Sequence, residues 1–274
     1  MSEKTIHLPP ESKGEARAAG RLAGRRVLVL GGGQMDIGEA DTPIGNGRAI
    51  SVLFAREGAT VAVADRDGAS AEATVALIEP GRAFAITADA TKEADITAMI
   101  DKAVSDMGGL IDGLVLNVGI GAGGPWLDGT SAESWDKVFA INLRSHMLTV
   151  KHALPKMADG SSIVFIASIA GLTAGSRLPA YDASKAGLLG LSRHVAFEGA
   201  RRAIRANVIA PGLMDTSIGR LATRGRPGRA ATQVPLGRQG TGWETAYAAL
   251  FLISDESAYV TAQVLAVDGG LSGL

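Results

Sequence analysis

Short apolar runs alternate with longer amphipathic stretches along the chain from Arg26 onward. Seven runs rich in valine and isoleucine span 26–32, 60–65, 83–87, 111–117, 161–168, 204–212 and 263–270. Their apolar character is continuous, whereas a strand with one face in water alternates between apolar and polar residues. The pattern therefore predicts seven strands that are buried on both faces of a parallel sheet.

Helical patterns fill the segments between these runs, for example at 47–58 and 92–108, and the second has apolar positions at helical spacing. Strands that alternate with helices indicate the α/β class. We expect one doubly wound, Rossmann-type domain over residues 26–274, with helices on both faces of the sheet. Residues 1–25 carry scattered charges and no apolar core, so we expect a flexible extension or an arm laid on a neighbour.

Composition narrows the range of partners. Lysine and arginine (27) nearly balance aspartate and glutamate (28), so no charge field favours nucleic acid or an anionic membrane. The chain has no cysteine, which excludes disulfides, thiolate metal sites and a cysteine nucleophile. Its four histidines lack ligand spacing, and no apolar run approaches the roughly 20 residues of a membrane span. We expect a cytoplasmic protein without a metal site or membrane contact, acting on a small molecule.

A glycine cluster follows the first predicted strand. Gly31, Gly32 and Gly33 end that strand, and the next helix begins near Gly45 and Gly47. Glycines allow a pyrophosphate to approach the backbone, and a helix N-terminus offers free N–H donors. Ligands of doubly wound sheets bind beyond the carboxyl ends of the strands. We therefore predict that Gly32, Gly45 and Gly47 contact a dinucleotide cofactor.

Asp65 ends the second predicted strand. A carboxylate there can accept both hydroxyls of the adenosine ribose and repels a 2′-phosphate, which favours NAD over NADP. Arg66 beside it acts in the opposite direction. The alternative is an ordinary turn or helix-cap aspartate.

Tyr181 and Lys185 lie four residues apart on a predicted helix, so their side chains share one face. A free tyrosine has a pKa of about 10, too high for a base near neutral pH. A neighbouring ammonium group, together with a cationic nicotinamide in a dry cleft, lowers that pKa because both stabilise the phenolate. The pair therefore predicts a tyrosine acid/base, although the same spacing also occurs by chance on surface helices.

Further motifs make the chain resemble the short-chain dehydrogenase/reductase family from Arg26 to Gly270. The segment LNVG (116–119) is similar to the family's N-N-A-G, with leucine in place of the first asparagine. INL (141–143), IASIAG (166–171), NVIAPGLMDT (207–216) and SAYVTAQVLAVDGGLS (257–272) follow in the family's order. Ser168 stands thirteen residues before Tyr181, the family's usual separation.

The resemblance implies four catalytic residues. In alcohol oxidation Tyr181 takes the hydroxyl proton, and reduction reverses the step. Lys185 binds the nicotinamide ribose and lowers the pKa of the tyrosine, while Ser168 holds the substrate oxygen. Asn142 supports a water relay behind the lysine, or, as an alternative, its amide fills a kink in the helix.

The resemblance also implies further cofactor contacts. Asp89 contacts adenine, with helix capping as the alternative. Asn117 and Gly119 shape the floor of the cofactor site, and the nicotinamide amide is lined by Pro211, Gly212 and Thr216.

These features predict an oxidoreductase that transfers hydride between NAD(H) and a secondary alcohol or ketone. The alternatives are a 3-oxoacyl-thioester reductase that uses NADPH, and a catalytically silent protein that senses dinucleotides. Because family members commonly form tetramers through two long helices, we also expect a homotetramer, formed here by the helix over 132–154 and the helix that carries Tyr181.

The segment 213–240 corresponds to the family's substrate lid. Its arginines at 220, 224, 226 and 229 could bind a carboxylate, a phosphate or an acyl carrier, or could simply be solvated. Trp126 and Arg177 are further candidates for the border of the substrate pocket.

The glycine turn departs from the family's T-G-x-x-x-G-x-G because twelve residues, instead of three, separate Gly32 from Gly45. Removing 35–43 restores the spacing, so we interpret these nine residues as an insertion. We expect a compact loop that leaves and returns at nearly the same place. Its acidic residues Asp36, Glu39 and Asp41 should point to solvent, a partner subunit or a cation. A neutral surface excursion and a flap over the cofactor both remain open.

Overall fold

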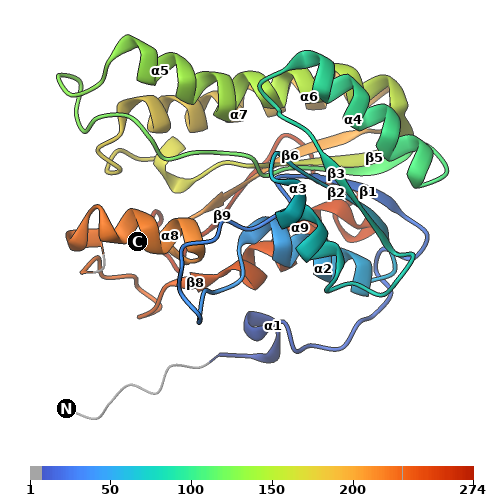
Figure 1. Ribbon diagram of the computed structural model, residues 1–274, viewed down its shortest axis with the longest axis horizontal. Coiled ribbons are helices and arrows are strands. Elements are labelled where there is room, and N and C mark those ends of the chain that lie inside the picture. The colour runs from blue at the N-terminus through green and yellow to red at the C-terminus, as the bar shows by residue number, and fades with distance from the viewer. Residues whose placement is uncertain (1–7, 230) are drawn as a thin grey trace.

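A seven-stranded parallel sheet forms the centre of the molecule, in the order β3-β2-β1-β4-β5-β6-β9 (Figure 1). The computed structural model describes residues 8–229 and 231–274. The strands are β1 (Arg26–Leu30), β2 (Thr60–Asp65), β3 (Ala83–Thr87), β4 (Ile111–Leu116), β5 (Met157–Ile166), β6 (Arg205–Pro211) and β9 (Val264–Val267). The predicted doubly wound α/β domain is confirmed.

Helices cover both faces of this sheet (Figure 1). One face packs against α2 (Asn46–Arg56), α3 (Gly68–Val75) and α9 (Gly242–Ile253). The other packs against α4 (Glu93–Asp106), α6 (Ser145–Ala153) and α7 (Pro179–Gly199), with α5 (Ala132–Phe139) beside α7. The sheet therefore separates two hydrophobic cores.

Strand β1 shows why the apolar runs are continuous. Leu28 and Leu30 point into the core beneath α4, α6 and α7, whereas Val27 and Val29 point into the core beneath α2 and α9. All four side chains are fully buried. Because both sides of the strand are covered, every position favours an apolar residue.

Smaller elements complete the chain. They are α1 (Pro10–Lys13), the π-helix η1 (Ala140–Arg144), α8 (Ser217–Arg224), the two-residue strands β7 (Met214–Asp215) and β8 (Gly240–Thr241), and the 3-10 turns η2 (Leu154–Lys156), η3 (Ile169–Gly171), η4 (Ala200–Arg202), η5 (Pro227–Arg229) and η6 (Asp255–Ser257). Strands β7 and β8 pair with each other. The two ends of the predicted lid are therefore tied together.

Residues 8–25, expected as a flexible extension or an arm on a neighbour, instead pack on the domain itself. The Ser12 hydroxyl donates to Glu244 at 2.8 Å, and the Thr241 hydroxyl donates to the Ser12 carbonyl at 2.8 Å. Leu22 is fully buried among the residues of the α2/α9 core. This segment caps that layer. The rest of the predicted extension, residues 1–7, lies outside the described residues.

The strand order places the candidate site. Strands β1 and β4 are neighbours, and the chain crosses over in opposite directions from them, which opens a crevice at their carboxyl ends. The glycine turn after β1 and Asn117 after β4 meet there. None of the helices in the described part of the chain is long and apolar enough to cross a membrane.

Candidate active site

The glycine turn brings the end of β1 against the start of α2. A side chain at Gly47 would overlap the Gly31 carbonyl oxygen, and one at Gly32 would approach the Val63 side chain to 2.7 Å. Gly45 is the N-cap of α2, and no side chain there accepts a bond from the first-turn N–H groups. Backbone packed this closely beside free N–H donors fits a pyrophosphate.

The inserted loop leaves and returns at one place, as expected. The Gln34 side-chain oxygen accepts from the Gly45 N–H at 2.8 Å, which closes the loop at its base. The Gln34 N–H in turn donates to the Ser70 hydroxyl at 2.7 Å. The turn on the cofactor side therefore keeps its geometry despite the insertion.

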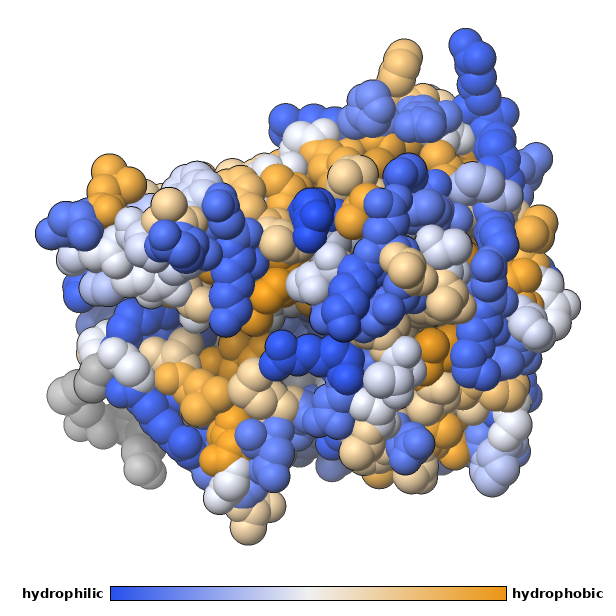
Figure 2. Space-filling model, turned by 45° about the horizontal axis from the view of Figure 1, so that its top comes forward, coloured by the Kyte–Doolittle hydropathy of each residue, from blue (hydrophilic) through white to orange (hydrophobic). Residues whose placement is uncertain are grey.

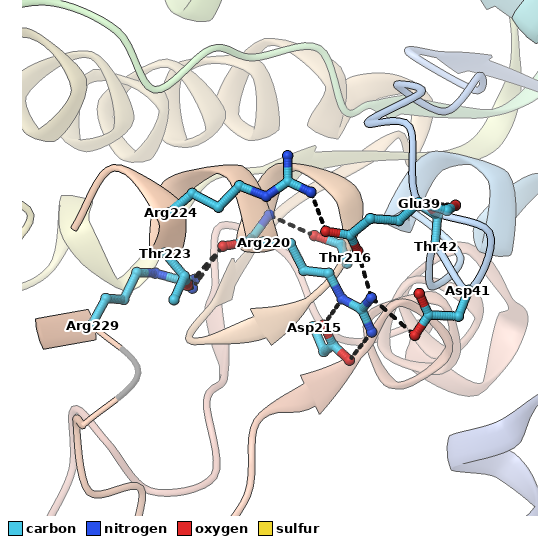
Figure 3. A network of polar contacts seen from close by, with 10 residues as sticks. Glu39, Asp41, Thr42, Asp215, Thr216, Arg220, Thr223, Arg224 and Arg229 are labelled. Atoms are coloured by element: carbon cyan, nitrogen blue, oxygen red, sulfur yellow. Dashed lines mark hydrogen bonds and ion pairs between the residues drawn. The ribbon is translucent and has the colours of Figure 1, made fainter. Parts of the chain in front are cut away.

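Of the three acidic residues of the loop, Asp36 and Asp41 are exposed, as the sequence predicted, whereas Glu39 is turned to the lid. Glu39 accepts from Arg220 at 2.7 Å and also binds Arg224, and Asp41 lies 3.3 Å from Arg220 (Figure 3). Both arginines belong to α8 in the lid. The prediction of solvent, a partner subunit or a cation is thus wrong for Glu39, because side chains distant in sequence already neutralise it. Asp36 stays exposed and accepts from the Gly38 N–H at 2.8 Å within the loop.

This Glu39 clasp, defined as Glu39 with Arg220 and Arg224, is reinforced from the lid side. Asp215 in β7 accepts from Arg220 at 2.9 Å (Figure 3). Hydrogen bonds from the two arginines lower the pKa of the Glu39 carboxyl, and bonds to Asp215 and Glu39 raise the pKa of Arg220. The carboxylates and guanidinium groups stabilise one another in their ionised forms, so these ion pairs hold the loop and the lid together near neutral pH.

Asp65 holds the glycine turn. Its carboxylate accepts from the Gly33 N–H at 3.0 Å and from the Asp67 N–H at 3.1 Å. The cap of α3 is Asp67, which accepts from the Ser70 N–H. Asp65 therefore stabilises a turn, which was one of the two alternatives, and its carboxylate faces the glycine turn. The helix-cap role belongs to Asp67.

Asp89 lies just after β3, and Asn117 lies just after β4, at the same carboxyl edge of the sheet. The Asp89 carboxylate accepts from the Thr91 N–H at 3.0 Å and from its hydroxyl at 2.7 Å, and these bonds lower the pKa of Asp89. The Asn117 amide donates to the Gly31 carbonyl at 2.8 Å. Asp89 thus stabilises a local turn, and its contact with adenine stays a prediction. Asn117 connects the end of β4 to the glycine turn.

Lys185 is buried beneath the catalytic edge. Its ammonium donates to the Ile166 carbonyl at 2.9 Å and lies 5.9 Å from the centre of the Tyr181 ring. Burial lowers the pKa of Lys185 to about 8. A side chain at Gly119 would come within 2.9 Å of the same ammonium group. Gly119 thus leaves room for the lysine head, in keeping with its predicted place at the site.

The pKa of Tyr181 is raised in the polypeptide alone, so the lowering predicted from the sequence depends on the cationic nicotinamide. Burial raises it, and this effect exceeds the lowering from the Ser168 side chain and from the positive charges of Arg229 and Arg226. Lys185 is not among the main causes. The polypeptide alone therefore favours the protonated phenol.

Asn142 joins the cluster through a helix irregularity. It lies in η1, where the helix expected over 132–154 is interrupted by a π turn between α5 and α6. Its amide donates to the Ile120 carbonyl and to the Ser184 hydroxyl, both at 3.0 Å, and its oxygen accepts from the Ile120 N–H at 2.8 Å. The Ser184 hydroxyl donates to the Tyr181 carbonyl at 2.8 Å. Asn142 fills the kink and contacts the helix of Tyr181 at the same time.

The segment after β6 leads into the lid. The Gly212 N–H donates to the Val267 carbonyl at 3.0 Å, directly after Pro211 at the end of β6. Thr216 is the N-cap of α8, and its hydroxyl accepts from the Gly219 N–H at 3.2 Å. Contact of these three residues with a nicotinamide stays a prediction. The observed role of Thr216 is to start the helix of the clasp.

Sequence reasoning could not orient two residues near the substrate side. The Trp126 N–H donates to the Arg177 carbonyl at 3.0 Å, and the Arg177 guanidinium lies 5.7 Å from the Trp126 ring centre. Both residues have left-handed backbone, with φ of 63°, which is uncommon for such side chains. The structure therefore joins these two loops at a strained point before α7.

His146 is a buried residue to which the sequence assigned no role. It is fully buried one turn after Asn142, and neither ring nitrogen has a hydrogen-bond partner among the described residues. Burial, aided by the charge of Lys185, lowers the pKa of His146 to about 3. The ring is thus neutral near the catalytic cluster. The described residues contain no cluster of three or more potential metal ligands.

The molecular surface is hollowed on the face shown in Figure 2. Hydrophobic residues line the depth of this hollow, and hydrophilic residues surround its rim. Such a surface suits a small organic molecule with a polar group.

Known proteins with similar sequences are dehydrogenases and reductases. Residues 42–272 match a family model described as enoyl-(acyl carrier protein) reductase. The chain is 36% identical to 2-(S)-hydroxypropyl-CoM dehydrogenase 3 of Xanthobacter autotrophicus, over 93% of this chain and 99% of that protein. It is also 36% identical to cis-4-hydroxycyclohexanecarboxylate dehydrogenase of Sinomonas cyclohexanicum, over 93% of this chain and all of that protein.

A solved structure shares the fold closely. A protein of Burkholderia xenovorans described as a short-chain dehydrogenase/reductase aligns with a TM-score of 0.84 at 38% identity, covering 93% of this chain and 99% of its own.

Proposed function

The chain belongs to the short-chain dehydrogenase/reductase family and is an oxidoreductase of alcohols or ketones; we propose that it uses NAD(H), with Tyr181 as the acid/base. The observation that carries the proposal is the meeting of Tyr181, Lys185, Asn142 and Ser168 at the carboxyl edge of the sheet. A helix contributes the first two residues, a π turn the third and the end of β5 the fourth.

The residues present fit a nicotinamide dinucleotide. The glycine turn and the N-terminus of α2 would hold the pyrophosphate, and Asp65 the adenosine ribose. Asn117 and Lys185 would flank the nicotinamide half. When bound, the nicotinamide ring supplies a hydride acceptor in its oxidised form and a hydride donor in its reduced form.

The chain's own groups manage the proton. In alcohol oxidation the phenolate oxygen of Tyr181 removes the hydroxyl proton, and in ketone reduction the phenol returns it. The Ser168 hydroxyl is placed to hold the substrate oxygen as negative charge develops on it. Burial of Tyr181 makes its ionisation depend on nearby positive charge, so proton removal is coupled to an occupied cofactor site.

Two other functions are less well supported. The first is reduction of a 3-oxoacyl thioester with NADPH, and the matching family model is likewise described as a reductase that acts on acyl carrier protein. The 2′-phosphate of NADPH would, however, be repelled by the Asp65 carboxylate if that carboxylate binds the ribose. A catalytically silent dinucleotide sensor would not require Ser168, Tyr181 and Lys185 together.

An activity screen tests the proposal. The purified protein is offered a panel of secondary alcohols and ketones with NAD(H) and NADP(H) in parallel. We expect hydride transfer with NAD(H). Bound NAD(H) without turnover of any alcohol or ketone would favour the sensor, and turnover only with NADPH and 3-oxoacyl thioesters would favour the reductase.

We also propose a cytoplasmic homotetramer. The face of α7 that turns away from the sheet leaves Phe197 exposed over 82% of its surface, which is costly for a large apolar side chain in water. Helix packing across a symmetry axis would cover it. Light scattering at micromolar concentration should give the tetramer mass, whereas a monomeric mass would refute this part of the proposal.

A further inference from the structure

The lid, residues 213–240, holds two kinds of arginine. Three of its arginines pair with carboxylates: Arg220 and Arg224 with Glu39, and Arg238 with Glu244 at 2.6 Å. Arg226 and Arg229 form no ion pair within the part of the chain that the structure describes. The Glu39 clasp thus leaves these two positive charges without an ion-pair partner among the described residues.

The guanidinium of Arg229 is held in place by hydrogen bonds, but these bonds use only some of its N–H donors. One of its terminal nitrogens donates to the Gly219 carbonyl at 3.0 Å and to the Thr223 hydroxyl at 2.7 Å, which fixes the guanidinium beside α8 (Figure 3). Its other N–H donors have no partner among the described residues, although a guanidinium carries five. The side chain is half-buried, so these donors are partly withdrawn from water.

Arg226 extends from the lid to the opposite wall. Its guanidinium donates to the carbonyl of Ser176, and Ser176 lies in the segment that leads into α7. The Ser176 hydroxyl accepts from the Leu178 N–H at 2.9 Å, immediately before that helix begins. Arg226 is therefore held between the lid and the loop that precedes Tyr181.

The charges of both arginines act at the catalytic tyrosine. Each lowers the pKa of Tyr181, so both lie on its side of the lid. Burial and the neighbouring charge of Arg226 lower the pKa of Arg229, and Tyr181 and the Asp215 carboxylate act in the opposite direction. Arg226 also lies within electrostatic reach of Asp182, whose carboxyl pKa is raised by burial. Each arginine thus has one carboxylate within electrostatic reach but no ion pair among the described residues.

We propose that Arg229, with Arg226 beside it, binds an anionic group of the substrate, a carboxylate or a similar small oxyanion. Two half-buried guanidinium groups within electrostatic reach of each other repel until an anion lies between them, and a carboxylate can accept from both. The substrate is then an alcohol or ketone that carries its charge away from the reacting carbon. The inference rests on the proposed function and names the substrate class of the same site.

Inhibition of a neutral substrate tests this inference. The screen above supplies a neutral alcohol that the enzyme oxidises, and its turnover is measured with a series of carboxylates from acetate to cyclohexanecarboxylate, each beside its neutral amide. We expect at least one carboxylate to compete with the alcohol at least ten times more tightly than its amide. Arg229→Gln should remove this preference, and Arg229→Lys should restore part of it.

Arg224→Gln is the matched control, because Arg224 lies in the same lid but turns to Glu39. It should leave the ratio of carboxylate to amide inhibition unchanged, and thermal melts should show that all variants are folded. Equal inhibition by every acid and its amide would overturn the inference, as would a preference that survives in Arg229→Gln. Failure to oxidise any neutral or acidic alcohol would instead count against the proposed function.

Discussion

Glu39 and Arg220 lie 181 positions apart in the chain, yet their side chains form an ion pair of 2.7 Å. Glu39 belongs to the inserted loop after β1, and Arg220 to the lid helix α8. The pair joins the loop after the glycine turn to the predicted substrate lid. The insertion therefore connects the end of β1 with the lid.

Glu39→Gln should loosen this connection. Exposed ion pairs contribute little individually, so we expect release of NADH to accelerate by about fivefold at most, with turnover still dependent on Tyr181. Stopped-flow measurement of NADH release at low and high salt checks this, since added salt should accelerate the wild type and leave the variant nearly unchanged. Asp36→Asn, in the same loop but bonded only to Gly38, should behave as wild type. Equal rates in Glu39→Gln and wild type would show that the clasp does not restrain the cofactor.

Deletion of residues 35–43 is a stronger version of the same test. The protein should fold, because Gln34 and Gly45 already meet at the base of the loop and closing a shorter loop costs no more. It should bind NAD and retain Tyr181-dependent activity, with the change confined mainly to cofactor release. A folded deletion variant that no longer binds NAD by calorimetry would mean that the loop supplies essential contacts.

Asp65 should set the cofactor preference. We expect NAD(H) to bind at least ten times more tightly than NADP(H), a difference of about 1.4 kcal/mol. Asp65→Asn should narrow that ratio, since it removes the charge and keeps an oxygen for the Gly33 N–H. Asp67→Asn, which alters only the cap of α3, is the control and should preserve the ratio. Calorimetry in which wild-type protein binds NADP(H) as tightly as NAD(H), or more tightly, would contradict the proposal that NAD is the cofactor.

His146 should make the fold sensitive to acid. Its pKa is about 3 in the folded protein and about 6.5 when unfolded, so between these values the unfolded chain binds the extra proton. Stability therefore falls as pH falls below about 6.5. Between pH 6.5 and 4.5 the wild type should lose about 2 kcal/mol more free energy of unfolding than His146→Gln.

Urea unfolding at the two pH values measures that difference. His194→Gln on the outer surface of α7 is the control, because it replaces an exposed histidine and leaves the buried ring of His146 in place. Identical pH slopes for the wild type and His146→Gln would show that the buried ring is not the acid-sensitive group.

The sheet could be predicted from the sequence because burial on both faces leaves a local record. The four residues of β1 after Arg26 are apolar for that reason, and they divide between the two cores. Motif spacing predicted four catalytic residues, and the structure brings these four, Tyr181, Lys185, Asn142 and Ser168, to one edge of the sheet.

Other features depend on partners far away in the chain. The π turn at Asn142 is stabilised by bonds to Ile120 and Ser184, which no periodicity within the helix records. The direction of Glu39 depends on arginines of the lid that follow it by more than 180 positions. The pKa of Tyr181 depends on how deeply the completed fold buries it.

Tyr181→Phe tests the central claim most directly. The substitution removes only the group that transfers the proton, so turnover of the preferred alcohol should fall by orders of magnitude while the dissociation constant for NADH stays within about threefold of wild type. Both quantities are measured on the same preparation, turnover by the absorbance of NADH and binding by its fluorescence. Retained turnover in this variant would show that another group transfers the proton and would contradict the account.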